Sequence, residues 1–128
     1  MPKMLELTLL EERFALVHLP PGASQPTWVR GAFTASLSSR RGTTVICASD
    51  CVPADLSVHA GFRCMEVAGI SALDSVGVVA AIVSPLAAAE IGIFAYSTWD
   101  TDYILVQETD LQLAALVLTE AGHGLHGF

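Results

Sequence analysis

Positive charge is scarce in this sequence of 128 residues. Lys3 is the single lysine, and the longest run of basic residues is Arg40-Arg41. Six basic residues stand against thirteen acidic ones, which gives a formal net charge of -7. This charge would repel a nucleic acid or an anionic membrane surface, so we expect neither as a partner. The balance favours a cationic or zwitterionic ligand instead.

Motifs of catalysis are missing as well. The sequence contains no G-x-S-x-G nucleophile elbow, and Schiff-base chemistry has no candidate beyond Lys3. Asp100 and Asp102 lie close enough in sequence for acid–base work, but two acids in a turn are a weak signal of catalysis. We therefore expect no enzymatic activity and no cofactor. A small enzyme that uses this acidic turn is the least favoured alternative.

The sequence contains three cysteines, Cys47, Cys51 and Cys64, which is a small and odd number. The N-terminal segment, MPKMLELTLLEE, carries acidic residues where a signal peptide has its apolar stretch. We therefore expect free, mostly buried thiols in a cytoplasmic protein.

No apolar run reaches the length of a membrane span. The longest uncharged apolar stretch covers residues 76–89 (VGVVAAIVSPLAAA), and Glu90 ends it. A spanning helix needs roughly 18–20 apolar residues. The stretch predicts a core helix that is followed by a buried strand.

The second half of the sequence alternates clearly between the two-residue period of strands and the roughly 3.6-residue period of helices. Strands are predicted at 62–67, 91–97, 102–107 and 123–128, and helices from 74 or 75 to 89 and from 109 or 110 to 121. Asp74 or Ser75 caps the first helix, and Pro85 should kink or restart it with Ser84 as a second cap. The order β-α-β-β-α-β is that of a ferredoxin-like unit.

The first half is less regular. Its patterns predict strands at 5–9, 13–19, 33–37 and 43–48, a short helix at 27–32 and a weak helix at 52–58. We interpret it as a degenerate copy of the same unit. The expected fold is α+β, with domains at 1–61 and 62–128, tandem ferredoxin-like units, an antiparallel sheet and helices on one face.

The second half also resembles an ACT domain. The resemblance rests on the loop GISALDSVG (69–77), the helix residues PLA (85–87), the strand IGIF (91–94) and the turn STWDTD (97–102). The chain is similar to the regulatory regions of aspartate kinases and, more closely, to small bacterial tandem-ACT proteins related to CASTOR-type arginine sensors. The resemblance implies a regulatory protein that binds a free amino acid at an interface between ACT units, forms a homodimer and acts on a separate enzyme.

The resemblance places the ligand beside the loop that opens the first helix. Gly77 leaves backbone N–H groups uncovered, which suits an α-carboxylate, while Asp74, Asp100 and Asp102 suit an ammonium. In the arginine sensors the segment that matches 98–102 contacts the ligand, with an acid at the position of Asp102. Thr101 stands where an aromatic residue is common, so the identity of the amino acid stays open. The expected ligand-binding residues are Asp74, Ser75, Val76, Gly77, Val78, Ser97, Thr98, Trp99, Asp100 and Asp102.

Plainer interpretations stand beside these. The STWDTD segment is also ordinary turn chemistry, and Gly77 also suits tight packing of a helix on a sheet. Under these interpretations the chain would be a structural or oligomerisation module with a vestigial pocket. His123 and His126, taken with Cys47 and Cys51, invite a metal site, but structural zinc sites show two compact ligand pairs. We expect no metal there, and instead buried thiols and solvent-facing imidazoles.

Overall fold

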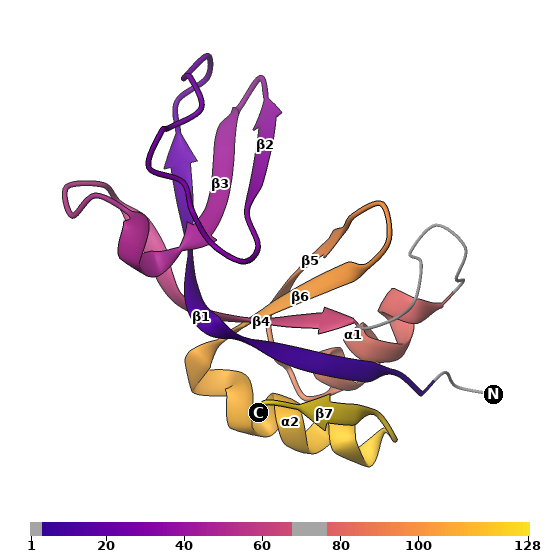
Figure 1. The fold of residues 1–128 in the computed structure, drawn as a ribbon. Helices are drawn as coiled ribbons and strands as arrows, with labels where there is room; N and C mark the ends of the chain where they lie inside the picture. The colour runs from indigo at the N-terminus through magenta and orange to yellow at the C-terminus, as the bar shows by residue number, and fades with distance from the viewer. Residues whose placement is uncertain (1–3, 68–76) are drawn as a thin grey trace. The chain divides into compact units, whose positions relative to one another are not determined.

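The computed structural model describes residues 4–67 and 77–128, which form two compact units (Figure 1). The first unit combines the N-terminal residues up to Glu11 with the chain from Arg63 onward, and the second unit is Glu12–Phe62. Strands β1 (Glu6–Leu19) and β4 (Val58–Val67) each contribute residues to both units. In sequence, the second unit is therefore an insertion into the first.

The first unit has the expected order of elements from β4 onward. The later elements are α1 (Val78–Ala88), β5 (Ile93–Ser97), β6 (Asp102–Gln107), α2 (Leu111–Glu120) and β7 (Gly124–His126), with a 3-10 turn at Glu108–Asp110 before α2. Its strands lie in the order β7-β1-β4-β6-β5. The β5–β6 pair is antiparallel, as expected, whereas β7 pairs β1 in parallel. The N-terminal part of β1 therefore lies between β7 and β4.

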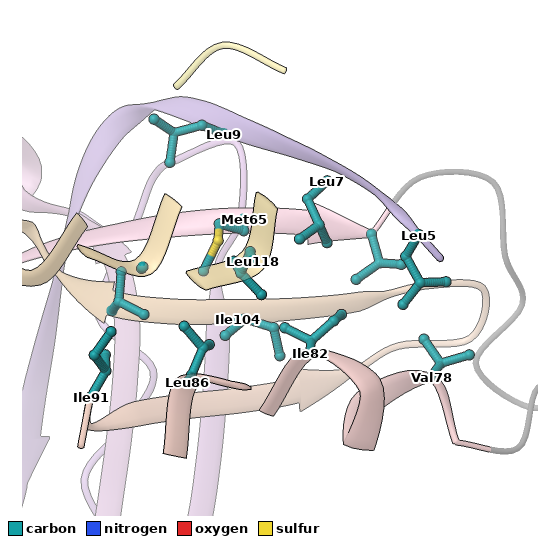
Figure 2. Close-up of a cluster of buried hydrophobic side chains, with 13 residues drawn as sticks. Leu5, Leu7, Leu9, Met65, Val78, Ile82, Leu86, Ile91, Ile104 and Leu118 are labelled. Atoms are coloured by element: carbon teal, nitrogen blue, oxygen red, sulfur yellow. The ribbon is translucent and has the colours of Figure 1, made fainter. Parts of the chain in front are cut away.

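Both helices pack on one face of these strands and share one apolar core (Figure 2). Leu5, Leu7 and Leu9 reach it because alternate residues of a strand face the same side. The other main members are Met65, Val67, Val78, Ile82, Leu86, Ile91, Ile104, Val106, Ala114 and Leu118. Burial of each large side chain contributes about 1.5–3 kcal/mol, so this cluster is the principal stabilising feature of the unit. No helix in the described part of the chain is long and apolar enough to cross a membrane.

Helix α1 contains Pro85 and runs on without a break, so of the two expected outcomes, a kink or a restart at Ser84, the restart is wrong. Proline has no N–H, which leaves the Ala81 carbonyl without its intrahelical donor. His123 supplies the missing donor, since its Nε2 lies 2.9 Å from Ala81 O. Its Nδ1 accepts the Leu5 N–H at 3.0 Å, which fixes the neutral tautomer with the proton on Nε2.

His123 is therefore buried, at 4% exposure, and the expectation of a solvent-facing imidazole at this position is wrong. Its two ring nitrogens connect the start of β1 to the middle of α1. The imidazole of His126, in contrast, is more than half exposed.

The second unit, all of which is described, consists of strands and a 3-10 turn at Ser49–Cys51, with no α-helix. Its strands are the C-terminal part of β1, β2 (Ala35–Ser39), β3 (Gly42–Ala48) and the start of β4. β3 pairs antiparallel with both β1 and β2. Val17, Val45, Cys47, Ala48 and Cys51 form a core of their own.

The helices expected at 27–32 and 52–58 are wrong. The carbonyl of Arg30 accepts the Ala48 N–H at 2.7 Å, so the first segment bonds to a strand end and not to itself. In the second segment the Leu56 N–H donates to Pro53 O at 3.2 Å, which closes a turn. The two strands expected at 5–9 and 13–19 are one continuous strand, β1. Its N-terminal part pairs with β7 and its C-terminal part pairs with β3.

Candidate functional site

The turn between β5 and β6 is closed by its own hydrogen bonds. The Thr98 N–H donates to Thr101 O at 2.8 Å, and the Thr101 N–H donates to the Thr98 hydroxyl at 3.3 Å. The single proton of that hydroxyl has two acceptors within reach, Thr101 O at 3.1 Å and an Asp100 carboxylate oxygen at 3.3 Å. The turn is therefore ordered locally, and the Thr98 hydroxyl is already used within it. The Trp99 side chain at the tip is 83% exposed.

Asp102 is the buried polar residue at the base of this turn, with 2% of its surface exposed. It begins β6 opposite Ser97 on β5, and the Ser97 hydroxyl donates to its Oδ1 at 2.5 Å. Removal of a carboxylate from water costs free energy unless hydrogen-bond donors or an opposite charge compensate for it. The Ser97 hydroxyl is a hydrogen-bond donor without a charge. The Thr101 hydroxyl donates to Val67 O, which ties the turn to the end of β4. The site thus offers a fixed, shielded carboxylate that suits a cationic group.

The start of α1 is the second part of the predicted site that the structure describes. Gly77 precedes the helix with φ of 82°, in the left-handed region that favours glycine. Within the described residues no atom lies within 4 Å of a Cβ at this position, so backbone conformation and not close packing requires the glycine. Within the described residues no side chain caps the helix, and its first turn has no acidic residue. Val78 points its side chain into the core and offers the site only its backbone.

The predicted residues therefore fall into three groups. Ser97, Thr98, Trp99, Asp100 and Asp102 come together in the β5–β6 hairpin. Gly77 and Val78 begin α1. Asp74, Ser75 and Val76 lie outside the described residues.

Tyr103 on β6 and Glu66 on β4 interact close to the predicted site residues but were not among them. The Tyr103 hydroxyl donates to Glu66 Oε2 at 2.7 Å, across from β6 to β4. Burial and the neighbouring Glu66 carboxylate raise the pKa of Tyr103 to about 12. The alternation of the sequence DYILVQ places Tyr103 and Ile104 on opposite faces, but it gives no hint of the partner on β4.

The three cysteines are free and buried, as expected. Burial raises the pKa of Cys47 and of Cys64 to about 12. The Cys51 thiol donates to Ala48 O at 3.1 Å. Across the described residues, no group of three or more His, Cys, Asp or Glu side chains is placed to hold a metal ion.

The C-terminal glycines follow the spacing G-x-G-x-x-G, at Gly122, Gly124 and Gly127. Dinucleotide-binding loops with this spacing come after a strand and open a helix. Here the pattern follows α2 and encloses β7, and Gly122 has φ of 96° where it ends the helix. The arrangement is that of a helix stop and a short strand, and it does not fit a dinucleotide.

Two cavities in the described part of the chain lie away from these residues. One, of about 330 Å³, is in the second unit, and the other, of about 410 Å³, is lined by residues of α2 and Phe128. None of the predicted site residues that the structure describes lines either of them.

Comparison with known proteins points to one family. Residues 57–120 match the family model of the ACT domain. The crystal structure of protein Atu0741 from Agobacterium tumefaciens is similar over 96% of this chain and 92% of its own, with 32% identity and a TM-score of 0.90. No curated protein matches.

More distant solved structures share the fold. A Vibrio cholerae protein of unknown function, described as a possible transport protein, is 21% identical over 91% of this chain and 89% of its own, with a TM-score of 0.74. The regulatory subunit of aspartate kinase from Thermus thermophilus is 10% identical over 94% of this chain and 99% of its own, with a TM-score of 0.62.

Proposed function

The chain belongs to the ACT domain family, and on that premise we propose that it is a non-catalytic regulatory protein that binds a free amino acid. The aspartate kinase regulatory subunit, which shares the fold, supports the regulatory part of this proposal. We place the ligand at an interface between ACT units of a cytoplasmic homodimer, with residues 1–61 of each chain as a degenerate ACT-like unit and residues 62–128 as the ACT unit. A separate enzyme reads the ligand-bound state.

The observation that carries the proposal is the buried carboxylate of Asp102. Its Oδ1 is held by a neutral hydroxyl at 2.5 Å, so its charge is oriented but not neutralised by that bond. An α-ammonium or a basic side chain would add a charge-assisted hydrogen bond in a place that is screened from water. The closed turn of residues 98–101 keeps the carboxylate in position before the ligand arrives.

The start of α1 supplies the complementary group. The N–H groups after Gly77, which no described side chain caps, carry partial positive charge and suit the α-carboxylate of an amino acid. Asp74, Ser75 and Val76 precede this position in sequence and complete the proposed ligand-binding set, and the exposed Trp99 is available to cover the ligand. A ligand that bridges both groups stabilises one arrangement of the units through its higher affinity for it.

A thermal-shift screen of the twenty amino acids tests the proposal. A specific ligand at one hundred times its Kd stabilises the native state by about 2.7 kcal/mol, which corresponds to roughly 10 °C in Tm for a domain of this size. Asp102→Asn keeps the size of the side chain and an acceptor for Ser97, and we expect it to abolish the shift. Glu120→Gln, at the exposed end of α2, removes the same charge and should leave the shift intact.

An equal ligand-dependent shift in wild type and Asp102→Asn would show that the site is misplaced. No shift with any amino acid would favour the second candidate, an oligomerisation module with a vestigial pocket. The exposed Leu113, Leu116 and Phe128 of the first unit are the observation behind that candidate.

A further inference from the structure

The two units carry opposite net charge. Residues 12–62 contain four arginines and three acidic residues, a net charge of +1, whereas the rest of the chain contains two basic and ten acidic residues, a net charge of -8. A cation is therefore attracted to the first unit, and an anion meets no comparable repulsion in the second. The acidity of the whole chain conceals this difference.

The second unit contains a cavity of about 330 Å³, which is within the size range of small-molecule sites. Part of its wall is apolar, formed by Leu16, Val17 and Val58. Leu16 and Val17 are buried in the unit, so this wall is a fixed surface. A short apolar group of a ligand would be shielded from water there.

The rest of the lining is polar and can donate hydrogen bonds, with His18, Ser57 and His59 exposed and Thr44 half-buried. It is formed by the imidazoles of His18 and His59 and the hydroxyls of Thr44 and Ser57. His18 and Thr44 are paired directly across β1 and β3, so their side chains lie side by side. Among the lining residues, all of which are described, none is acidic. Such a set suits an acceptor-rich anion and would not neutralise an ammonium.

Gly42 leaves the space that the His18 ring occupies. A Cβ at Gly42 would lie 2.5 Å from His18 Cε1 and 2.7 Å from Leu19 O, and Gly42 has φ of 133°. Both the space and the backbone conformation therefore require glycine at the start of β3. The imidazole thus packs directly on the backbone of the neighbouring strand.

We propose that this cavity binds a small organic anion, a carboxylate with a short apolar tail. The tail packs on Leu16, Val17 and Val58, and the carboxylate accepts hydrogen bonds from His18 and His59 with the Thr44 and Ser57 hydroxyls beside them. This site is separate from the amino-acid site proposed above, and it belongs to the second unit alone.

Histidine NMR on the full chain tests the proposal, with isovalerate as the probe. We expect saturable shifts of the His18 and His59 ring resonances, with the His123 and His126 resonances unmoved. Isovaleramide has the same shape without the charge, and it should bind at least about tenfold more weakly. Equal binding of the amide, or equal shifts at His126, would overturn the proposal. So would zinc binding at His18 and His59 without any response to isovalerate, because the cavity would then be a metal site.

His59→Gln and His18→Gln should each weaken isovalerate binding about tenfold, with His126→Gln as the matched control of unchanged affinity. If His18→Gln disturbs the fold, as a loss of amide dispersion would show, His59→Gln decides alone. Unchanged affinity in His59→Gln contradicts the proposed site. Asp102→Asn should bind isovalerate like wild type, so the two proposals fail or survive separately.

Discussion

Burial controls the chemistry of the thiols at the scale of single residues. Cys64 is fully enclosed in β4, and burial, with a smaller contribution from the Glu66 carboxylate, raises its pKa from 9.0 to about 12. Cys47 is shifted in the same direction, to about 12, with burial as the largest cause. Folding therefore holds both thiols protonated, because the thiolate is poorly solvated inside the protein. These cysteines are expected to be poor nucleophiles in the native state.

The shift of Cys64 predicts a loss of stability at alkaline pH. Because the pKa in the folded state is raised, its contribution is fully present below pH 9 and is lost as the pH rises toward 12. Cys64→Ala should therefore make the free energy of unfolding fall less steeply above pH 9. Urea titrations from pH 8 to pH 11 measure this slope.

Val67→Ala is the control for that measurement, since Val67 is a buried, non-titrating residue of the same strand. It should lower stability and keep the wild-type slope. Tyr103, whose pKa is also raised to about 12, contributes to the slope in all three proteins. The charge of Cys64 is a minor cause of that shift, so its removal in Cys64→Ala also makes the slope less steep. Identical slopes in wild type and Cys64→Ala would contradict the assignment.

Helix α1 shows how one element depends on a distant residue. Pro85 removes the N–H that would bond to Ala81 O, and His123 bonds to that carbonyl from beyond the end of α2. The same ring accepts the Leu5 N–H, which is 118 residues away in sequence. A proline inside a helix ordinarily costs about 3 kcal/mol, part of it through the unpaired carbonyl. His123 offsets that part of the cost.

A double-mutant cycle of His123 and Pro85 measures this compensation. His123→Ala leaves the Leu5 N–H and the Ala81 carbonyl without partners, and we expect it to lower the free energy of unfolding by about 3 kcal/mol. In the background of Pro85→Ala, the N–H at position 85 bonds to Ala81 O. There the same change should cost about 1 kcal/mol less.

Urea unfolding of the four proteins gives the coupling energy directly. Leu125→Ala, on β7 beside the same core, is a suitable control, because its effect should be the same in both backgrounds. Additive effects of the His123 and Pro85 substitutions would show that the histidine does not compensate for the proline.

At the scale of the whole molecule, the first unit has an exposed apolar surface on α2 and at the C-terminus. In the first unit, α2 exposes Leu113 and Leu116, and Phe128 is exposed at the C-terminus. Phe128 also lines the cavity of about 410 Å³, together with Glu108, Leu111, Gln112 and Ala115. Large exposed apolar side chains on one helix are typical of a surface that contacts another protein.

Substitution of Leu116 tests whether this surface is used in the proposed homodimer. If α2 lies at the interface, Leu116→Glu should shift the protein toward the monomer, because a buried charge without a partner opposes association. Thr119→Glu introduces the same charge on the next turn of the helix. The oligomeric states of the two variants show how the effect depends on the position of the charge. Sedimentation velocity over a range of concentrations gives the oligomeric state. An unchanged dimer in Leu116→Glu would exclude this surface as the interface.

By itself the sequence determined the elements whose patterns are local. The strand Asp102–Gln107, the turn that precedes it and the helix that ends before Gly122 follow from alternation, turn residues and a glycine stop within a few residues of one another. The expectation of free thiols rests on the odd number of cysteines. The hairpin half of the predicted site is local too, which is why its members are found together.

Only the tertiary structure decided the features that join distant parts of the chain. The Arg30 carbonyl bonds to Ala48 and not within a helix, and β1 pairs with β3 at one end and with β7 at the other. Local propensity does not encode these pairings, because each depends on where a second segment lies once the chain is folded. The same holds for the His123 bridge, and for the cavity at His18 and His59, whose residues come from three strands and the loop before β4. In this protein, periodicity predicts the elements of the C-terminal half, and long-range hydrogen bonding and packing decide which side chains meet.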